Sequence, residues 1–273
     1  MINMKGGVGK STLAVNLAWH FFWWKKKRVL LVDLDPQFNA SQYTIGATAF
    51  QALIEGQKPT VWNIFEQYSR SPALPNPGPF DIKSAIYNVR KRADGARLDL
   101  IPSRLELAHT LRSPAQKEDL LSRAIRQIEN EYDLVIFDCA PTESLLTYAA
   151  YAASDQIVIP VKPEFLSTIG LPLLAQSLAD FKGQRGGAGP DIAGILFTHT
   201  EAYSPEEILS KKEVKAVANQ RGWYVFDKEM PFSRSFPKGA REGSPIFGTS
   251  HARGFQIQRF AAMADEFAQR VGL

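Results

Sequence analysis

The sequence contains very little cysteine, with Cys139 as the single thiol in 273 residues. One cysteine excludes an intrachain disulfide and any metal site that needs several thiolates from one chain. Because a free cysteine is commonly a small buried residue, we predict that Cys139 lies in the core. Histidine is also scarce and shows no spacing typical of metal ligands. We interpret all four as structural: His20, His109, His199 and His251.

Long apolar runs are absent too, since no stretch of about 18 uncharged apolar residues occurs. The N-terminal residues lack the features of a secretory signal, so we expect a cytoplasmic protein with no membrane partner. Hydrophobic residues make up 45% of the sequence, and no repeat or linker divides it, which predicts one domain spanning residues 1–273. A net charge of +4 and a pI near 9.1 permit an anionic partner such as nucleic acid.

Short apolar segments alternate with longer amphipathic ones, the pattern of parallel strands joined by crossover helices. Strands buried on both faces should be nearly all apolar, and this predicts strands at residues 28–33, 132–138, 156–161 and 192–198. Helical spacing or composition predicts helices at residues 11–24, 116–131, 167–181, 205–221 and 252–271. The predicted fold class is α/β, with a doubly wound, mostly parallel sheet and helices on both faces.

Two further segments are distinguished by their turn residues. Asp94-Gly95 separates two strand-like segments, which predicts a β-hairpin over residues 85–101. Four prolines within residues 71–80 predict an irregular loop.

Residues 3–12 read NMKGGVGKST and almost match the phosphate-binding pattern G-x-x-x-x-G-K-[ST], with Met4 in place of the first glycine. Glycines in such a loop turn backbone N–H groups toward phosphate oxygens, and the dipole of the following helix adds attraction. The residues predicted to bind the nucleotide are Gly6, Gly7, Val8, Gly9, Lys10, Ser11 and Thr12. Lys10 would supply positive charge, Ser11 would hold Mg²⁺, and Thr12 would contact the α-phosphate.

A phosphate-binding loop should follow a strand, yet only residues 1–4 precede Lys5. This is short for a central strand, which needs about five residues. We therefore expect either that Met1 is not the natural start or that the first strand is unusually short. Lys5 is a second lysine in the loop, although one lysine ordinarily suffices for one triphosphate.

Carboxylates follow two of the predicted strands, at the sheet edge where open α/β folds bind ligands. Asp33 and Asp35 stand in VDLDPQ, and Asp138 ends LVIFD. Any one of them could equally be a solvated residue or a helix cap, but three beside a phosphate loop favour a site. Asp138 is placed like the acidic residue that reaches Mg²⁺ in nucleotide sites. The three residues after it include no glutamate to activate water, so we expect slow, assisted hydrolysis.

The segments KGGVGKST, LLVDLDPQ, LVIFDCAPT and IPVKPEFLSTIGL together resemble the ParA/MinD family of deviant Walker-type P-loop ATPases, ParA branch, over nearly the whole chain. The resemblance implies ATP and Mg²⁺ as cofactors and an ATP-dependent homodimer in which Lys5 contacts the phosphates bound by the second subunit. A triphosphate between Lys5 and Lys10 would offset their repulsion. The resemblance also implies that Asp35 positions the attacking water and that Asp33 and Asp138 serve the metal. Lys5, Lys10 and Asp35 are thus the predicted catalytic residues.

Two other segments also resemble the family. Residues 101–108, IPSRLELA, resemble its IPS stretch. Met230-Pro231 resembles the segment that often borders the adenine, so the resemblance predicts that Pro231 binds the nucleotide. The chain departs from the family at Phe232, where an arginine is usual.

Other branches of the superfamily fit these residues less well. Iron-protein and metal-carrier branches need pairs of cysteines, and the membrane-binding MinD branch ends in a basic amphipathic helix. Here an apolar stripe beside a mixed polar face predicts a C-terminal helix packed on the core. The stripe consists of Ile257, Phe260, Ala264, Phe267 and Val271. A branch of small-molecule ligases remains an alternative, although it usually lacks Lys5.

Basic residues gather in the C-terminal third, where resembling proteins bind DNA without sequence preference as the ATP dimer. The candidates are Arg234, Lys238, Arg241, Lys211, Lys212 and Lys215, and a solvated helix face explains the last three equally well. The predicted function is a slow ATPase that positions plasmid, chromosome or other cargo with a ParB-like or cargo-adaptor protein, and is nucleoid-associated when ATP is bound. The alternatives are an ATP-dependent small-molecule ligase and a nucleotide-binding scaffold without DNA binding.

Overall fold

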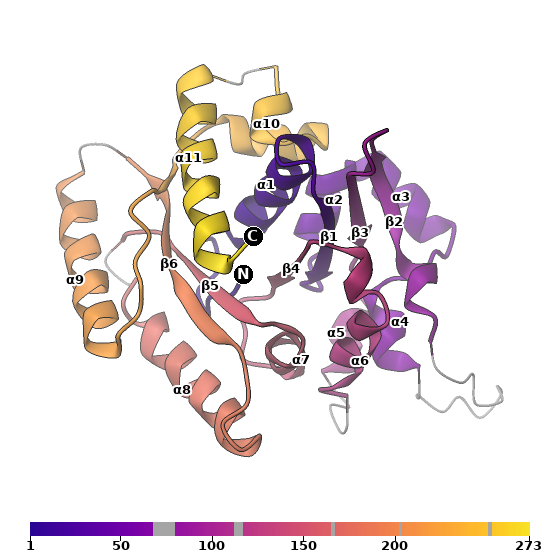
Figure 1. Ribbon diagram of the computed structural model, residues 1–273, viewed down its shortest axis with the longest axis horizontal. Helices are drawn as coiled ribbons and strands as arrows, with labels where there is room; N and C mark the ends of the chain where they lie inside the picture. Colours follow the sequence, from indigo (N-terminus) through magenta and orange to yellow (C-terminus); the bar gives the residue numbers. More distant parts are fainter. Residues whose placement is uncertain (68–79, 112–116, 165–166, 202–203, 251–252) are drawn as a thin grey trace.

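The computed structural model describes residues 1–67, 80–111, 117–164, 167–201, 204–250 and 253–273 (Figure 1). The predicted proline-rich loop, residues 71–80, lies outside these ranges apart from Phe80, and His251 also lies outside them. Across the described ranges, none of the helices has the length and apolar character that a bilayer span requires.

The strands form two hydrogen-bonded groups. They are β1 (Arg28–Leu34), β2 (Tyr87–Lys91), β3 (Arg97–Ile101), β4 (Leu134–Cys139), β5 (Gln156–Val161), β6 (Asp191–Thr200) and β7 (Met230–Pro231). Their order is β2-β3-β1-β4 in one group and β5-β6-β7 in the other, with every described pair parallel except β2–β3. The predicted fold class is confirmed. The hairpin is confirmed as well, since Gly95 turns the chain between β2 and β3 with a φ of 89°.

The helices agree with the prediction where the apolar pattern is long. They are α1 (Lys10–Trp23), α2 (Asn39–Ile45), α3 (Ala47–Glu55), α4 (Val61–Glu66), α5 (Leu107–Thr110), α6 (Leu120–Arg126), α7 (Leu145–Ala153), α8 (Gly170–Gln184), α9 (Pro205–Arg221), α10 (Ser235–Glu242) and α11 (Gly254–Val271). One prediction was wrong in detail: the described part of the predicted helix 116–131, residues 117–131, contains the short helix α6 and the separate 3₁₀ turn η2 (Glu129–Glu131). The helix stops because Ile128 adopts φ −127° and ψ 1°, outside the helical region.

The residues before the loop form no strand, but they join the two groups of strands. The amino group of Met1 donates to the carbonyl oxygen of Phe137 at 2.7 Å. The Met1 oxygen accepts from the Cys139 N–H at 3.3 Å, and the Ile2 N–H donates to Val158 at 3.1 Å. Met1 and Ile2 thus lie between β4 and β5, where they hydrogen-bond to both strands. Alongside Met1, a cavity of about 420 Å³ separates the two strands near their amino ends.

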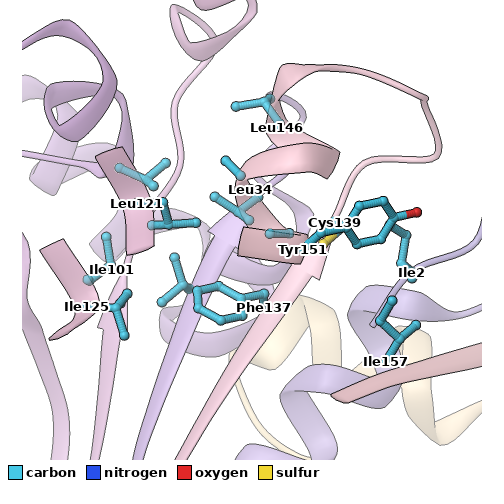
Figure 2. Packing of buried hydrophobic residues seen from close by; sticks show 14 of the residues in the cluster. Ile2, Leu34, Ile101, Leu121, Ile125, Phe137, Cys139, Leu146, Tyr151 and Ile157 are labelled. Carbon is cyan, nitrogen blue, oxygen red and sulfur yellow. The ribbon is translucent and has the colours of Figure 1, made fainter. Parts of the chain in front are cut away.

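The apolar core has two parts, one on each face of the sheet. Along β1, Leu30 and Val32 pack into one part, whereas Val29 and Leu31 pack into the other. The first part includes side chains of α4, α6, α7, α8 and α9, and the second includes those of α1, α2, α10 and α11. Helices therefore cover both faces, as predicted. Cys139 is buried within the first part, near the centre of Figure 2, which confirms its predicted place in the core.

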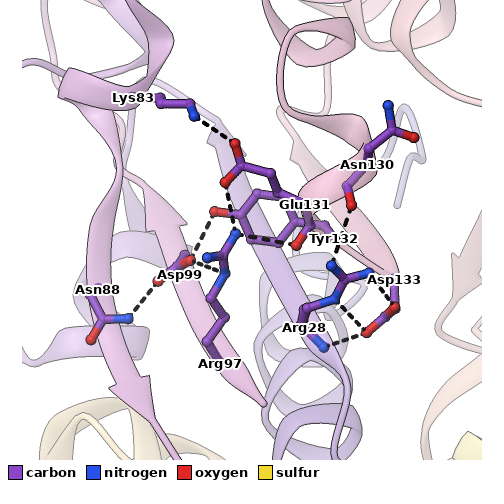
Figure 3. Close-up of polar contacts among 9 residues, drawn as sticks. All are labelled: Arg28, Lys83, Asn88, Arg97, Asp99, Asn130, Glu131, Tyr132 and Asp133. Carbon is purple, nitrogen blue, oxygen red and sulfur yellow. Dashed lines mark hydrogen bonds and ion pairs between the residues drawn. The ribbon is translucent and has the colours of Figure 1, made fainter. Parts of the chain in front are cut away.

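A polar network holds the amino ends of β1, β3 and β4 (Figure 3). The Arg28 guanidinium donates to Asp133 at 2.8 Å, which ties the start of β1 to the residue before β4. Asp99 on β3 accepts from the Tyr132 hydroxyl at 2.8 Å and from Asn88 at 2.7 Å. These polar groups hydrogen-bond to one another, so this end of the sheet has a structural role. The predicted site residues lie at the opposite, carboxyl ends of the strands.

Candidate functional site

The phosphate loop is anchored from the neighbouring strands. The buried Thr198 hydroxyl on β6 donates to the carbonyl oxygen of Val8 at 2.7 Å. Asn3 is also buried: its side chain donates to Pro160 on β5 at 2.7 Å and accepts from the Lys5 N–H at 2.9 Å. These contacts fix both sides of the loop without using its glycine N–H groups.

Gly9 is the N-cap of α1 and has a φ of 79°, a conformation that favours glycine. A Cβ at this position would also lie 2.6 Å from the Cε1 atom of His199, so the close approach requires glycine as well. Because α1 begins at Lys10, the first N–H groups of the helix have no intrahelical acceptor. The loop and the start of α1 thus lie together as the predicted phosphate site requires, and anion binding there stays a prediction.

The two lysines of the loop are placed differently. Lys10 is 6% exposed, and its Nζ donates to the carbonyl oxygen of Lys5 at 3.0 Å. Burial lowers the pKa of Lys10, and the charges of Asp138 and Asp35 act against that shift. Lys5 instead forms an ion pair with Glu164 at 2.6 Å, and its side chain is 27% exposed. Lys10 therefore hydrogen-bonds within its own loop, whereas Lys5 lies at the loop's edge and pairs with a residue outside it.

Glu164 is shared by two cations. Its Oε1 atom pairs with Lys5, and its Oε2 atom pairs with Lys162 at 2.9 Å. Hydrogen bonds from Lys5 and then Lys162 lower the pKa of Glu164, which keeps it ionised. The residue follows β5 and was not identified from the sequence. Its charge offsets part of the repulsion that Lys5 and Lys10 would otherwise have.

Asp33 organises the segment between β1 and α2. Its Oδ1 accepts from the Asp35 N–H at 3.0 Å, and its Oδ2 accepts from the Ser41 N–H at 2.8 Å and the Ser41 hydroxyl at 2.7 Å. The Ser41 hydroxyl in turn accepts from the Ser103 N–H at 3.0 Å, which brings the predicted IPS stretch to this segment. These donors already occupy both of its carboxylate oxygens, which would compete with a metal. Direct metal binding by Asp33 therefore stays a prediction.

Asp138 differs from Asp33, because neither of its carboxylate oxygens has a hydrogen-bond partner among the described residues. The side chain is fully buried, and burial raises its pKa to about 6. The positive charges of the Met1 amino group and Lys10 oppose that shift, but neither hydrogen-bonds the carboxylate, so a cation bound to it would be favourable. Ser11 is close enough to lower this pKa, so Ser11 and Asp138 fit the predicted Mg²⁺. Among the described residues no three His, Cys, Asp or Glu form a metal cluster, so phosphate oxygens and water would have to complete the shell.

A cavity of about 460 Å³ opens above the loop. It brings together the predicted residues Gly6, Gly7, Gly9, Lys10, Ser11, Thr12 and Asp35. Asp35 is 7% exposed, and its Oδ1 accepts from the Gln37 N–H at 2.9 Å. The buried residues Val8, Asp33 and Asp138 are not part of the lining, and neither are Lys5 and Pro231. The volume suits a nucleotide-sized ligand.

Seven lining residues were missed by the sequence reading: Gln37, Asn39, Gln42, Tyr43, Pro141, His199 and Ala240. Gln37 and Pro141 stand within the quoted segments VDLDPQ and DCAPT, so those motifs could have indicated them. The others come from α2, β6 and α10, which carry no local signal for a nucleotide site. Of these, His199 lies against the loop itself, since a Cβ on Gly9 would meet its ring.

The predicted DNA-binding residues fall into two separate groups. Arg234, Lys238 and Arg241 are spaced by four and three residues at and along α10, so they share one side of that helix. Lys211 on α9 is paired with Glu229 at 2.8 Å, whereas Lys212 is exposed, as is Lys215. Figure 1 shows α9 and α10 on different sides of α11. The structure therefore does not combine the six cations into one surface.

Comparison with known proteins places this geometry in a family. A family model described as an AAA domain matches residues 1–186. The chain is 32% identical to the chromosome partitioning protein ParA of Myxococcus xanthus, over 90% of this chain and 77% of the relative.

Two solved structures share the fold. One is an ATP complex of a McdA variant from Cyanothece, with a TM-score of 0.78, 18% identity and coverage of 99% of this chain and 94% of that chain. The other is cobyrinic acid a,c-diamide synthase from Mycobacterium smegmatis with ADP and magnesium, with a TM-score of 0.70, 21% identity and coverage of 99% and 93%. With the phosphate loop, its two lysines and the strand-end aspartates in place, the chain belongs to the ParA/MinD family of P-loop ATPases.

Proposed function

We propose that this protein is an ATP-dependent partition-type ATPase that dimerises on ATP, binds DNA without sequence preference and positions cargo with a partner protein. The observation that carries the proposal is the separation of the two lysines. Lys10 is buried in its own loop, whereas Lys5 is partly exposed at the loop's edge. A lysine in that place can reach a triphosphate held by a second copy. The naming of the Myxococcus xanthus relative as a chromosome partitioning protein supports the same role.

Each residue of the site has a distinct task in this proposal. The loop N–H groups and Lys10 would bind the phosphates, and Ser11 with Asp138 would hold Mg²⁺, which neutralises phosphate charge. Asp35 would orient the attacking water, since its carboxylate lines the same cavity as the loop. Asp33 would keep Asp35 in place, because it accepts the Asp35 N–H. Hydrolysis would be slow until a partner completes the site.

The DNA surface that fits best is the outer side of α10. Arg234 and Arg241 are exposed, and Lys238 pairs weakly with Glu242 at 3.7 Å. Three cations on one monomer neutralise few phosphates, so affinity at physiological salt should be low. A dimer would present two such surfaces, and binding of the second would become effectively intramolecular. DNA binding would therefore follow ATP-dependent pairing, and contact with phosphates would make it indifferent to sequence.

The deciding experiment is retention of the intact protein on duplex DNA with Mg²⁺ and a slowly hydrolysed ATP analogue, compared with ADP. We expect retention with the analogue only. Replacing Arg234 and Arg241 by alanine should flatten the slope of log affinity against log salt by about one unit for each lost phosphate contact.

A matched control removes the same charge elsewhere. Arg123 and Arg126 lie on α6, which packs in the other part of the core from α10. Their double alanine variant should keep the wild-type salt slope. An unchanged slope in the Arg234 and Arg241 variant would move the DNA surface elsewhere, with Lys212 and Lys215 next in line. Absence of ATP-dependent retention by the wild-type protein would refute the DNA-binding role and favour a scaffold or a small-molecule ligase.

A further inference from the structure

The carboxyl end of α1 presents two adjacent tryptophans to solvent. Trp23 is 48% exposed and Trp24 is 39% exposed, whereas the preceding Phe21 and Phe22 are buried. Because α1 starts at the phosphate loop and has 14 residues, this end lies about 21 Å from the loop. Neither tryptophan lines the cavity above the loop. Large apolar side chains that gather on a surface often mark an interaction site, and the nucleotide site does not use these two.

Trp24 connects the end of α1 to the segment that follows α10. Its ring packs against Phe247, with the ring centroids 4.3 Å apart and the ring planes inclined by 34°. Phe247 lies in η3 (Ile246–Gly248), the turn after α10. The exposed tryptophans therefore lie next to the part of the chain that carries the proposed DNA surface (Figure 1).

Three lysines follow the tryptophans, and two of them have no partner. Lys25 pairs with Asp265 at 2.7 Å. The ammonium groups of Lys26 and Lys27 form neither an ion pair nor a hydrogen bond with a described residue, and Lys26 is exposed. Lysines at the end of a helix stabilise its dipole, but that role explains neither tryptophan.

The carboxylates near these two lysines already pair with arginines. Asp94 pairs with Arg92 at 3.1 Å, and Asp133 pairs with Arg28 at 2.8 Å. The hydrogen bonds from these arginines lower the pKa of each carboxyl, with smaller contributions from the charges of the neighbouring lysines. The positive charge of the lysines is therefore not offset by free carboxylates, which suits an anionic partner.

Nucleic acid fits this surface better than a membrane does. A helix that binds a bilayer surface lies on it with its apolar face free. The apolar side chains of α1, such as Leu13 and Leu17, are instead buried in the core. Ammonium groups and indole N–H groups can both donate to phosphate oxygens, and contacts of this kind carry no sequence information.

We propose that Trp23, Lys26 and Lys27 form a second contact with the phosphate backbone of duplex DNA, continuous with α10 through Trp24 and Phe247. The proposal rests on the DNA binding proposed above, but not on which residues of α10 take part. Two lysines would be added to the three cations of α10 in each subunit. The contact would therefore raise both the affinity and its dependence on salt.

The charge is tested by retention on duplex DNA with Mg²⁺ and a slowly hydrolysed ATP analogue over a range of salt concentrations. Lys26 has a φ of 54°, which asparagine tolerates, so Lys26→Asn with Lys27→Ala removes both charges without adding backbone strain. The slope of log affinity against log salt should flatten by about one unit for each lost phosphate contact. The double alanine variant of Arg123 and Arg126 is again the control and should keep the wild-type slope.

Tryptophan fluorescence tests the aromatic part of the surface. Duplex DNA should quench the wild-type signal in the presence of the analogue, and Trp23→Phe with Trp24→Phe should abolish most of this quenching. Phenylalanine keeps a ring against Phe247 but removes the indole N–H, so affinity at constant salt should fall about three- to tenfold, the size of one hydrogen bond. The unfolding temperature of each variant should stay within about 4 °C of the wild type.

Several outcomes would overturn the second contact and leave the proposed function intact. They are an unchanged salt slope in the lysine variant, and wild-type quenching in the tryptophan variant. Tighter binding of single-stranded DNA of the same length would assign the tryptophans to unpaired bases. Quenching by polyglutamate or by phosphatidylserine vesicles, but not by duplex DNA, would assign the surface to an acidic protein or to a membrane. Absence of ATP-dependent retention by the wild-type protein is a different failure, because it refutes the DNA-binding role itself.

Discussion

The ion pair between Lys5 and Glu164 forms in the monomer and must break in the proposed ATP dimer, so changing it should change the dimer Kd. Lys5 must leave or reorient from Glu164 to reach phosphates on a second copy. The two side chains are 27% and 38% exposed, and their closest atoms are 2.6 Å apart. Pairs with this exposure contribute only about 0.2–1 kcal/mol because solvent screens them. Breaking one pair in each subunit therefore costs at most about 2 kcal/mol.

The proposed contact in the dimer is larger. A hydrogen bond to a charged group contributes about 1.5–3 kcal/mol, and a symmetric dimer has two such contacts. Because the alanine variant also removes the monomer ion pairs that oppose dimerisation, replacing Lys5 by alanine should cost about 1–6 kcal/mol of dimer stability, or about five- to 10⁴-fold in the dimer Kd. Glu164→Gln should act in the other direction, because it frees Lys5 in the monomer. It should tighten the dimer by about two- to thirtyfold.

Sedimentation velocity with Mg²⁺ and a slowly hydrolysed ATP analogue measures both changes over a range of protein concentrations. The matched control is Glu131→Gln, because Glu131 is also 38% exposed and also pairs with two cations, Lys83 and Arg97. It lies in η2 before β4, at the amino ends of the strands, whereas the loop lies at their carboxyl ends, so the dimer Kd should not change. An unchanged dimer in Lys5→Ala would refute the exchange of lysines between subunits. A weaker dimer in Glu164→Gln would mean that Glu164 supports Lys5 after pairing rather than before it.

Three further variants test other parts of the site and the core. Lys10→Ala should abolish ATP binding in calorimetry, because the loop loses its buried charge; micromolar binding would show that the site is misplaced. Asp35→Ala should bind ATP and dimerise, but steady-state hydrolysis should fall about 10²-fold or more, since water positioning lowers the barrier and not the ground state; wild-type turnover would move that role to another residue. Burial lowers the pKa of His20 to about 4 from 6.5, so the unfolded state binds the proton first. Its contribution to the free energy of unfolding is full above pH 6.5 and falls by up to about 3 kcal/mol as the pH drops to 4. His20→Leu should therefore flatten the plot of the free energy of unfolding in urea against pH over this range. An equal slope in both proteins would argue against a buried neutral His20.

Much of the fold could be predicted because local and tertiary preferences agree. The bounds of α9 follow from the capping residues at its two ends. Ser204 accepts from the Glu207 N–H as the N-cap, Pro205 occupies the first turn, and Gly222 ends the helix at a φ of 67°. The central strands could be predicted equally well, since strands buried on both faces are nearly continuous apolar segments.

The cavity residues outside the phosphate loop and the strand-end motifs could not be predicted. Only seven residues form α2, too few to show a helical period, and its start is fixed by the contact of Ser41 with Asp33. His199 and Ala240 reach the cavity from β6 and α10, about 190 and 230 positions beyond the loop. Such approaches are consequences of packing, and no short segment of sequence encodes them.

The aspartates illustrate a different limit. Asp33 and Asp138 both stand at the ends of buried strands, and as residue types they are identical. Asp33 accepts three hydrogen bonds, from the Asp35 N–H and from the N–H and hydroxyl of Ser41, whereas among the described residues Asp138 has only the nearby Ser11 hydroxyl, without a hydrogen bond of normal geometry. Only the surroundings distinguish a loop anchor from a carboxylate that can meet a cation. The sequence could identify the cluster of aspartates, but it could not assign a separate role to each of them.

The helix α10 connects the proposed nucleotide site to the proposed DNA surface. Ala240 lines the cavity, while Arg234 and Arg241 are exposed on the same short helix. Its contact with α2 leaves little room, since a Cβ on Gly239 would lie 3.0 Å from the Tyr43 hydroxyl. That hydroxyl accepts from Asn16 at 2.9 Å, and Asn16 also donates to the Thr12 carbonyl oxygen at 2.8 Å.

These contacts form a continuous path from the phosphate loop through α1 and α2 to α10. Closely packed elements move together because their interfaces do not deform freely. A shift of α2 on nucleotide binding would therefore carry the basic side of α10 with it. In that case the three cations would respond to the nucleotide without contacting it. It is enough that the glycine at position 239 keeps α10 against Tyr43.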